Sequence, residues 1–272
     1  MAQLFEQYLV LTDLDGTVVD EALNILPRDI EAISYFIANG GTFGVSTGRV
    51  MVSAMPLVRR LPTNAPCVFL NGGAIMDPHT GVFLHRSYLD ESGREALRQI
   101  TGHFPDLRAA VLMGDDFYNV TEFGDGKTPF DMDVPQTIAA DLDTMPGGWY
   151  KVLMNIMDYS MDEVDAFCRS LDYPRLKFIR STVNYYEVMP AENSKARGNR
   201  LLAQLKSWQD KTLVVIGDYF NDLEMIRDAD LGVTVEAAPQ LVKDAADLVV
   251  CDVHQGAVCQ LVQRLEAMSR GR

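Results

Sequence analysis

The sequence predicts an α/β protein in which a doubly wound parallel sheet is interrupted by an inserted α+β domain. Short apolar runs alternate with amphipathic helices in both end sections of the 272-residue chain. Such alternation is typical of parallel sheets built from β-α-β units. Between the two end sections, the sequence pattern changes to longer strand-like runs and a turn-rich stretch. We therefore expect core sections at residues 1–84 and 189–272 and an inserted domain at residues 85–188.

The first core section begins with a buried strand at residues 8–11, which Gly16 and Thr17 end with a turn. The next segment is predicted to be a helix, because its apolar positions share one face and two glycines follow it. The elements expected after the first strand are a helix at residues 27–39, a strand at 42–45, a second helix after Arg49, a strand at 67–70 and a hairpin of 74–76 with 82–84.

The insert has less regular patterning. Its expected elements are a helix at residues 91–101, a strand at 109–113, turns from 114 to 135, a strand at 150–157, a helix at 161–170 and strands at 176–180 and 183–188.

The last section returns to strict alternation. Its expected elements are helices at residues 194–205, 222–227, 238–245 and 257–268 and strands at 213–216, 231–235 and 248–251. Ligands of doubly wound sheets bind outside the carboxyl ends of the strands. Catalytic or ligand-binding residues are therefore expected directly after the strands.

Acidic and hydroxyl side chains follow three of these strands. Asp13 and Asp15 follow the first strand, Thr47 the second, and Asp218 the first strand after the insert, with Asp222 close behind it. On an ideal strand Asp13 and Asp15 would share one side, because side chains alternate with period two, although a lone Asp-x-Asp is more often a polar turn. Four carboxylates at one edge are unfavourable without a cation and suit Mg²⁺.

Two further residues can serve an anionic ligand at this edge. A hydroxyl and free N–H groups at a helix N-terminus form an anion site, although an ordinary helix cap is the simpler explanation of Thr47 alone. Lys195 begins the helix after the insert and can supply a fixed positive charge, although a lone lysine is usually solvated surface.

The composition excludes several classes of protein. The formal net charge of -14 argues against a nucleic-acid partner, which requires a basic surface. No segment resembles a signal peptide or approaches the roughly twenty apolar residues of a membrane span. The 4 cysteines are scattered and form no CxxC pair. We therefore expect a soluble, cytoplasmic protein with reduced thiols.

Four ordered motifs resemble those of the haloacid dehalogenase-like phosphatases. They are Asp13-Leu14-Asp15-Gly16-Thr17, Ser46-Thr47-Gly48-Arg49, Lys195, and Gly217-Asp218-Tyr219-Phe220-Asn221-Asp222. The insert between the second and third motifs is similar to the large α/β cap of the Cof-type branch, whose core is Rossmann-like. Asn71-Gly72-Gly73-Ala74 and Glu187 also resemble that branch. The insert matches the cap only in its position between the motifs and in its mixed pattern of helices and strands.

The resemblance implies a mechanism. Asp13 would be the nucleophile that forms an aspartyl phosphate, and Asp15 would be the general acid and base. Asn221 would orient Lys195 or Asp222. Mg²⁺ would be held by the carboxylates of Asp13 and Asp218, the backbone carbonyl of Asp15 and, directly or through water, Asp222. Contacts to the phosphoryl group or the rest of the substrate would come from Gly16, Thr47, Gly48, Asn71, Lys195 and Asn221.

Two positions depart from the branch. Ala196 stands where a glycine is usual, and Glu236-Ala237 replaces a usual Gly-Asn. The second departure argues against a phosphate or hydroxyl contact from that loop.

Three functions remain open at this point. We favour a hydrolase of small phosphomonoesters. A phosphotransferase such as a phosphomutase would use the same nucleophile, and a binding module without catalysis would have no need of Asp15. The acidic loop at residues 115–133 and the residues Tyr118, Tyr185 and Tyr186 favour a hydroxyl-rich leaving group, such as that of a sugar phosphate, or a phosphorylated cofactor precursor.

Overall fold

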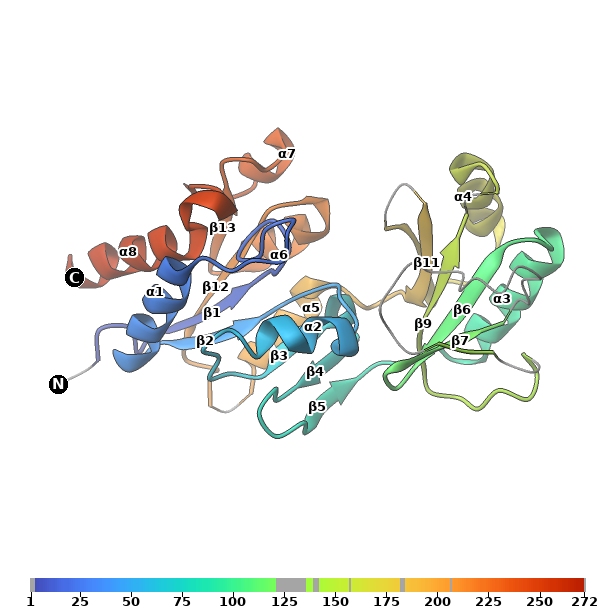
Figure 1. Ribbon diagram of the computed structural model, residues 1–272, viewed down its shortest axis with the longest axis horizontal. Helices are drawn as coiled ribbons and strands as arrows, with labels where there is room; N and C mark the ends of the chain where they lie inside the picture. The colour runs from blue at the N-terminus through green and yellow to red at the C-terminus, as the bar shows by residue number, and fades with distance from the viewer. Residues whose placement is uncertain are drawn as a thin grey trace. The chain divides into compact units, whose positions relative to one another are not determined.

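The computed structural model describes residues 3–120, 136–138, 142–156, 158–181, 184–205 and 207–271. The chain forms two compact units, Met1–Arg86 with Ser194–Arg272 and Ser87–Asn193 (Figure 1). The sequence had suggested divisions after residues 84 and 188. The second division comes later because strand β11 (Tyr185–Pro190) continues pairing within the inserted unit. Among the described residues, no helix has the length and hydrophobicity that a membrane span requires.

The core unit is built on a parallel sheet, which confirms the predicted fold class. All four strand pairs in this sheet are parallel, and β1 lies between β12 and β2. The strands in spatial order are β14 (Leu248–Val250), β13 (Leu231–Val235), β12 (Thr212–Gly217), β1 (Tyr8–Thr12) and β2 (Thr42–Val45). Every residue of β1 and β2 is buried, as continuous apolar runs in a sheet covered on both faces predict.

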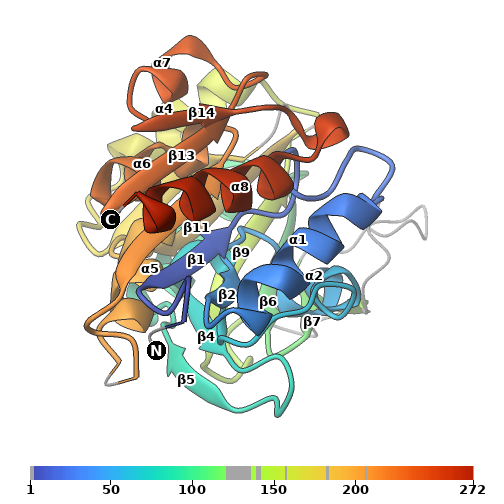
Figure 2. The same cartoon turned by 90° about the vertical axis from the view of Figure 1, so that its left-hand side faces the viewer.

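Helices cover both faces of this sheet. The chain moves one way from β1 to β2 and the other way from β12 to β13, so right-handed crossovers place the intervening helices on opposite faces. Helices α1 and α8 pack side by side on one face (Figure 2), and α5 packs against α6. The helices are α1 (Pro27–Ala38), α2 (Met51–Val58), α5 (Lys195–Ala203), α6 (Leu223–Asp228), α7 (Gln240–Lys243) and α8 (Ala257–Arg270), with short 3-10 turns η2 (Phe220–Asp222) and η3 (Val253–Gln255).

A small antiparallel sheet lies beside strand β2. It contains β3 (Cys67–Phe69), β4 (Ala74–Met76) and β5 (Phe83–Arg86), and the predicted hairpin of the last two is confirmed. A single bridge between Ser46 and Val68 links this sheet to the end of β2. The 3-10 turn η1 (Leu70–Gly72) joins β3 to β4.

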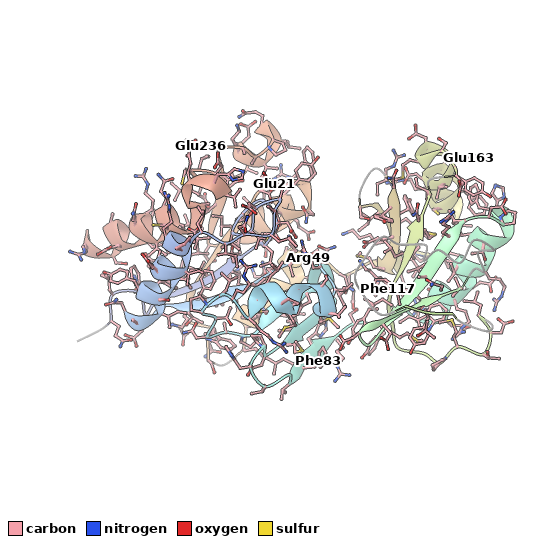
Figure 3. The ribbon with its side chains drawn as sticks, in the orientation of Figure 1. Glu21, Arg49, Phe83, Phe117, Glu163 and Glu236 are labelled. Atoms are coloured by element: carbon pink, nitrogen blue, oxygen red, sulfur yellow. The ribbon has the colours of Figure 1, made fainter. Side chains whose placement is uncertain are left out.

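The inserted unit is a six-stranded sheet with two helices. Apolar side chains of α3 (Glu91–His103) and α4 (Met161–Ser170) form one hydrophobic core with alternate residues of the strands. Glu163 lies in the acidic first turn of α4 (Figure 3). The strands in spatial order are β10 (Leu176–Arg180), β11 (Tyr185–Pro190), β9 (Trp149–Asn155), β6 (Arg108–Met113), β7 (Asp116–Asn119) and β8 (Gln136–Ile138).

Strand β7 lies in the stretch for which only turns were expected. The turn is confined to Gly114 and Asp115, and Asp116–Asn119 then pairs with β6 in antiparallel register. Phe117 explains the difference, because its side chain is 1% exposed and a buried aromatic residue favours the pleated pairing over a loop. Residues 121–135 of the predicted acidic loop lie outside the described residues.

Candidate active site

Adjacent parallel strands bring two aspartates together. Strands β1 and β12 pair with Thr12 opposite Ile216, so the residues that follow them emerge at the same edge. The backbone N–H of Asp13 donates to the carbonyl of Ile216 at 2.8 Å, which continues the ladder by one residue. Asp218 follows β12 directly. The register of the two strands therefore places Asp13 and Asp218 side by side.

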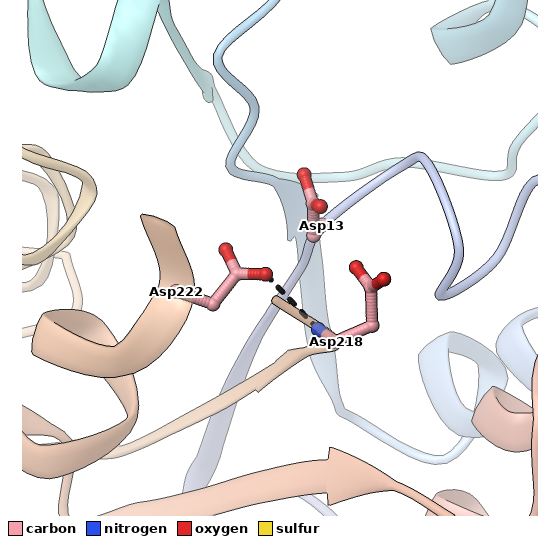
Figure 4. Close-up of side chains that lie close together, drawn as sticks. All are labelled: Asp13, Asp218 and Asp222. Atoms are coloured by element: carbon pink, nitrogen blue, oxygen red, sulfur yellow. Dashed lines mark hydrogen bonds between the residues drawn. The ribbon is translucent and has the colours of Figure 1, made fainter. Parts of the chain in front are cut away.

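A tight turn adds a third carboxylate. One oxygen of Asp222 accepts a hydrogen bond from the backbone N–H of Asp218 at 3.0 Å (Figure 4). The same oxygen accepts from the backbone N–H of Tyr219 at 3.2 Å. Gly217 makes this turn possible, because a side chain there would collide with Asp222. One carboxylate oxygen from each of Asp13, Asp218 and Asp222 lies within 4.8 Å of the others.

Lys195 connects two of these carboxylates. Its Nζ lies 2.7 Å from Oδ1 of Asp13 and 2.6 Å from Oδ1 of Asp222, and the residue is 1% exposed. It begins α5, whose N-cap residue Ser194 accepts a hydrogen bond from the N–H of Arg197. The lysine is therefore part of the buried cluster and is not a surface residue.

Glycines fix the position of this lysine. A Cβ atom on Gly198 would lie 2.6 Å from Cγ1 of Val68 and 2.8 Å from Cα of Gly72, and one on Gly72 would collide with the carbonyl of Ser194. The first turn of α5 therefore packs directly against the backbone of η1. Side chains at either glycine would move Lys195 away from its partners.

The cluster carries more negative charge than the lysine can balance. Burial raises the pKa of Asp13 to about 8, with Asp222 and Asp218 adding to the rise and Lys195 opposing it. Burial and Asp222 likewise raise the pKa of Asp218 to about 6. Burial would lower the pKa of Lys195, but the two carboxylates outweigh it and raise that pKa above its ordinary value. The two buried carboxylates of Asp13 and Asp222 and the half-buried carboxylate of Asp218 supply the oxygen ligands that Mg²⁺ prefers, so these three residues fit this ion.

A strained loop lies beside the predicted phosphate-binding turn. The N–H of Asn71 donates to the carbonyl of Thr47 at 3.2 Å, and a Cβ atom on Gly48 would lie 2.8 Å from Oδ1 of Asn71. Leu70 and Asn71 have φ angles of 57° and 51°, which non-glycine residues rarely adopt. Such strain often accompanies functional sites. The structure thus brings Thr47, Gly48 and Asn71 together.

Asp15 lies outside the carboxylate cluster. The ideal-strand argument for Asp13 and Asp15 is wrong, because β1 ends at Thr12 and both residues lie beyond its end, Asp13 buried and Asp15 exposed. The side chain of Asp15 is 50% exposed and pairs with Arg49. Gly16, with φ of 72°, completes the turn, and a Cβ atom there would collide with Asp218.

Asn221 and Glu236 both lie in connections that follow strands of the core sheet. Asn221 is exposed, and no hydrogen bond among the described residues joins its side chain to Lys195 or Asp222. Glu236 also lies exposed, immediately after β13 (Figure 3).

The three tyrosines that were expected to favour a hydroxyl-rich leaving group differ in their exposure. Tyr186 is 0% exposed, and its hydroxyl donates to Asp165 at 2.6 Å, so it belongs to the core of that unit and cannot meet a substrate. Tyr118 and Tyr185 are half-buried.

Two residues of the sequence motifs have partners that were not predicted. The hydroxyl of Thr17 donates to Oδ1 of Asp218 at 3.4 Å, and Arg49 holds Asp15. Both residues stand within the quoted motifs, but the order of residues alone does not say which side chains meet.

The chain matches the model of the haloacid dehalogenase-like hydrolases over residues 10–262. It is 22% identical to a putative phosphatase of Haemophilus influenzae, covering 93% of this chain and 96% of that protein. It is 23% identical to the pyridoxal phosphate phosphatase YbhA of Escherichia coli, covering 93% and 97%. The crystal structure of a haloacid dehalogenase-like hydrolase from Bacteroides thetaiotaomicron has a TM-score of 0.80 at 22% identity, covering 95% of this chain and 99% of that one.

Proposed function

Because this chain belongs to the haloacid dehalogenase-like hydrolases, we propose that it is a Mg²⁺-dependent phosphomonoester hydrolase that works through an aspartyl phosphate. The observation that carries the proposal is the buried contact of Lys195 with both Asp13 and Asp222, beside Asp218. A carboxylate attacks a phosphate dianion only where cations offset the repulsion between them.

The residues divide the reaction between them. An oxygen of Asp13 forms a bond to phosphorus while the bond from phosphorus to the leaving oxygen breaks, and Asp15 gives that oxygen a proton. Water then attacks the aspartyl phosphate, Asp15 takes the proton of that water, and inorganic phosphate leaves Asp13. Lys195 keeps Asp13 in one rotamer, because its Nζ lies 2.7 Å from Oδ1.

The remaining groups bind charge. Asp13, Asp218 and Asp222 would hold Mg²⁺, with the backbone carbonyl of Asp15 as a further ligand. When bound, the ion supplies electrostatic stabilisation of the negative charge on the phosphoryl group. The hydroxyl of Thr47 and the N–H of Gly48 would bind phosphoryl oxygens.

We propose small phosphorylated metabolites as substrates. Sugar phosphates are the first class, because the half-buried residues Tyr118 and Tyr185 favour a hydroxyl-rich leaving group over a polyanionic one. Pyridoxal phosphate is the second, since the similar Escherichia coli protein is named for it. Hydrolysis is the proposed reaction, and transfer to a second substrate is the alternative that product analysis separates from it.

A phosphate-release screen tests the proposal. Sugar phosphates, pyridoxal phosphate and nucleotides would be assayed with Mg²⁺ and with a chelator. We expect release only with the metal, and none from Asp13→Asn. Asp158→Asn is the matched control, because that carboxylate is exposed in the inserted unit. Undiminished release by Asp13→Asn would contradict the proposal, and an isomerised product in place of free phosphate would indicate a mutase.

A further inference from the structure

Arg49 makes a two-point contact that the mechanism above does not use. Its Nε lies 2.7 Å from Oδ2 of Asp15 and its Nη2 lies 2.5 Å from Oδ1. Arg49 lies between β2 and α2 in the chain (Figure 3), and Asp15 lies between β1 and α1, so the pair joins the second motif to the first. The pair is at the surface, with 27% of the Arg49 side chain and 50% of the Asp15 side chain exposed.

The backbone of Arg49 is anchored to the predicted phosphate-binding loop. Its N–H donates to the hydroxyl of Thr47 at 3.1 Å, and its carbonyl accepts from Leu70 at 3.1 Å. The charge of Asp13 also reaches the guanidinium, since it adds to the rise in the pKa of Arg49 that the hydrogen bond to Asp15 chiefly causes. A change of partner therefore requires movement of the side chain only.

The charge of the cluster leaves a role for a second cation. One lysine faces three carboxylates, so the cluster has no surplus of positive charge for an arriving phosphate dianion. A guanidinium presents two parallel N–H donors that match two phosphate oxygens as well as they match a carboxylate. A surface ion pair of this kind contributes little stability, so a dianion can compete for it.

We propose that Arg49 exchanges partners, holding Asp15 in the free enzyme and transferring to the oxygens of the substrate phosphate when it binds. This inference rests on the proposed function and adds to it a phosphate-binding residue and a substrate-dependent release of Asp15. The carboxyl group of Asp15 would then be free to turn toward the leaving oxygen only when a phosphate is present.

Binding of inorganic phosphate, the reaction product, tests the exchange without turnover. Titration calorimetry with Mg²⁺ would compare the wild type, Asp15→Asn, Arg49→Met and the double variant. Asp15→Asn frees Arg49, so we expect phosphate to bind about fivefold tighter, the equivalent of one exposed ion pair. Arg49→Met should weaken binding about tenfold through loss of a charge-assisted contact.

The double variant separates exchange from simple repulsion. Removal of the Asp15 charge relieves repulsion in either background, whereas release of Arg49 requires Arg49 to be present. We therefore expect Asp15→Asn to raise the phosphate affinity by a larger factor in the wild-type background than in the Arg49→Met background. Arg49→Lys, which keeps the charge but not the two-point contact, should bind phosphate more weakly than the wild type. Arg60→Met, which removes an exposed arginine that contacts the carbonyl of Leu23, is the control for loss of surface charge.

The outcomes distinguish this inference from the proposed function. Equal gains from Asp15→Asn in both backgrounds, or no gain in either, would overturn the exchange while leaving hydrolysis by Asp13 intact. Absence of phosphate binding together with absence of turnover in the wild type would overturn both. Loss of binding in Arg60→Met as large as that in Arg49→Met would also overturn the assignment.

Discussion

Replacement of Lys195 by methionine should destabilise the protein, because it removes the positive charge that offsets the carboxylate cluster. The lysine is 1% exposed and contacts Asp13 and Asp222 at 2.7 and 2.6 Å, so the variant leaves three carboxylates without a counter-ion. Removal of one partner from a buried ion pair costs about 3–5 kcal/mol. We expect a loss of this size in the free energy of unfolding of the metal-free protein at pH 9.

The loss should depend on pH and on Mg²⁺. The pKa values of Asp13 and Asp218 are raised to about 8 and about 6 in the folded protein. A raised carboxyl pKa contributes stability that is fully present below its unfolded value of about 4 and is lost as the pH rises through the folded value. The deficit of Lys195→Met should therefore shrink between pH 9 and pH 5. It should also shrink when Mg²⁺ binds the folded protein, because the ion replaces the missing charge.

Urea denaturation with and without a chelator measures both effects. Lys151→Met is the matched control, because Lys151 is 6% exposed and pairs with the buried Glu187 at 2.8 Å in the inserted unit, which contributes no carboxylate to the cluster. We expect a destabilisation in this variant that Mg²⁺ does not reverse. Equal stabilisation by Mg²⁺ in Lys195→Met and the wild type, or reversal of the Lys151→Met defect by Mg²⁺, would refute the charge argument.

Three further predictions concern single positions in the core unit and their controls. Gly16→Ala should raise the Mg²⁺ concentration needed for half-maximal activity at least tenfold, because its Cβ would collide with the carboxylate of Asp218. Gly81→Ala is its control, because Gly81 has the same φ of 72° but open space around it. This variant should lose about 1 kcal/mol of stability through strain and keep its metal affinity. Gly198→Ala should lower kcat at least tenfold, because its Cβ would displace α5, the helix that Lys195 begins. Gly102→Ala should leave kcat unchanged, because its Cβ would meet nothing within 4 Å. Equal kcat values in these two variants would contradict the packing argument. Burial raises the pKa of Asp29 to about 6, so its contribution to stability is lost as the pH rises through that value. The free energy of unfolding of Asp29→Asn should exceed that of the wild type by about 3 kcal/mol at pH 8 and not at pH 4. An equal difference at both pH values in denaturation experiments would count against this.

Much of the secondary structure in both units could be predicted from the local sequence pattern. The strand at Leu231–Val235 and the helix at Met161–Ser170 were predicted with the bounds observed, because apolar periodicity and flanking turn residues act over a few positions. Strand β7 was missed, since its pairing depends on β6 and on the burial of Phe117, neither of which a local window contains.

The site divides in the same way. The residue types at Asp13, Lys195, Asp218 and Asp222 were enough to predict a cation at one sheet edge, because the carboxyl ends of parallel strands meet there. Which oxygens approach one another was decided by tertiary structure.

The sequence by itself therefore determined the alternation of elements and the stock of charged groups that the fold must neutralise. Only the tertiary structure decided that Lys195 is buried between two carboxylates while Asp15 turns outward to Arg49. The physical reason is that charge partners are chosen by distance and burial. Both depend on strand register and on the close packing of Gly72 with Gly198, which join parts of the chain far apart in sequence.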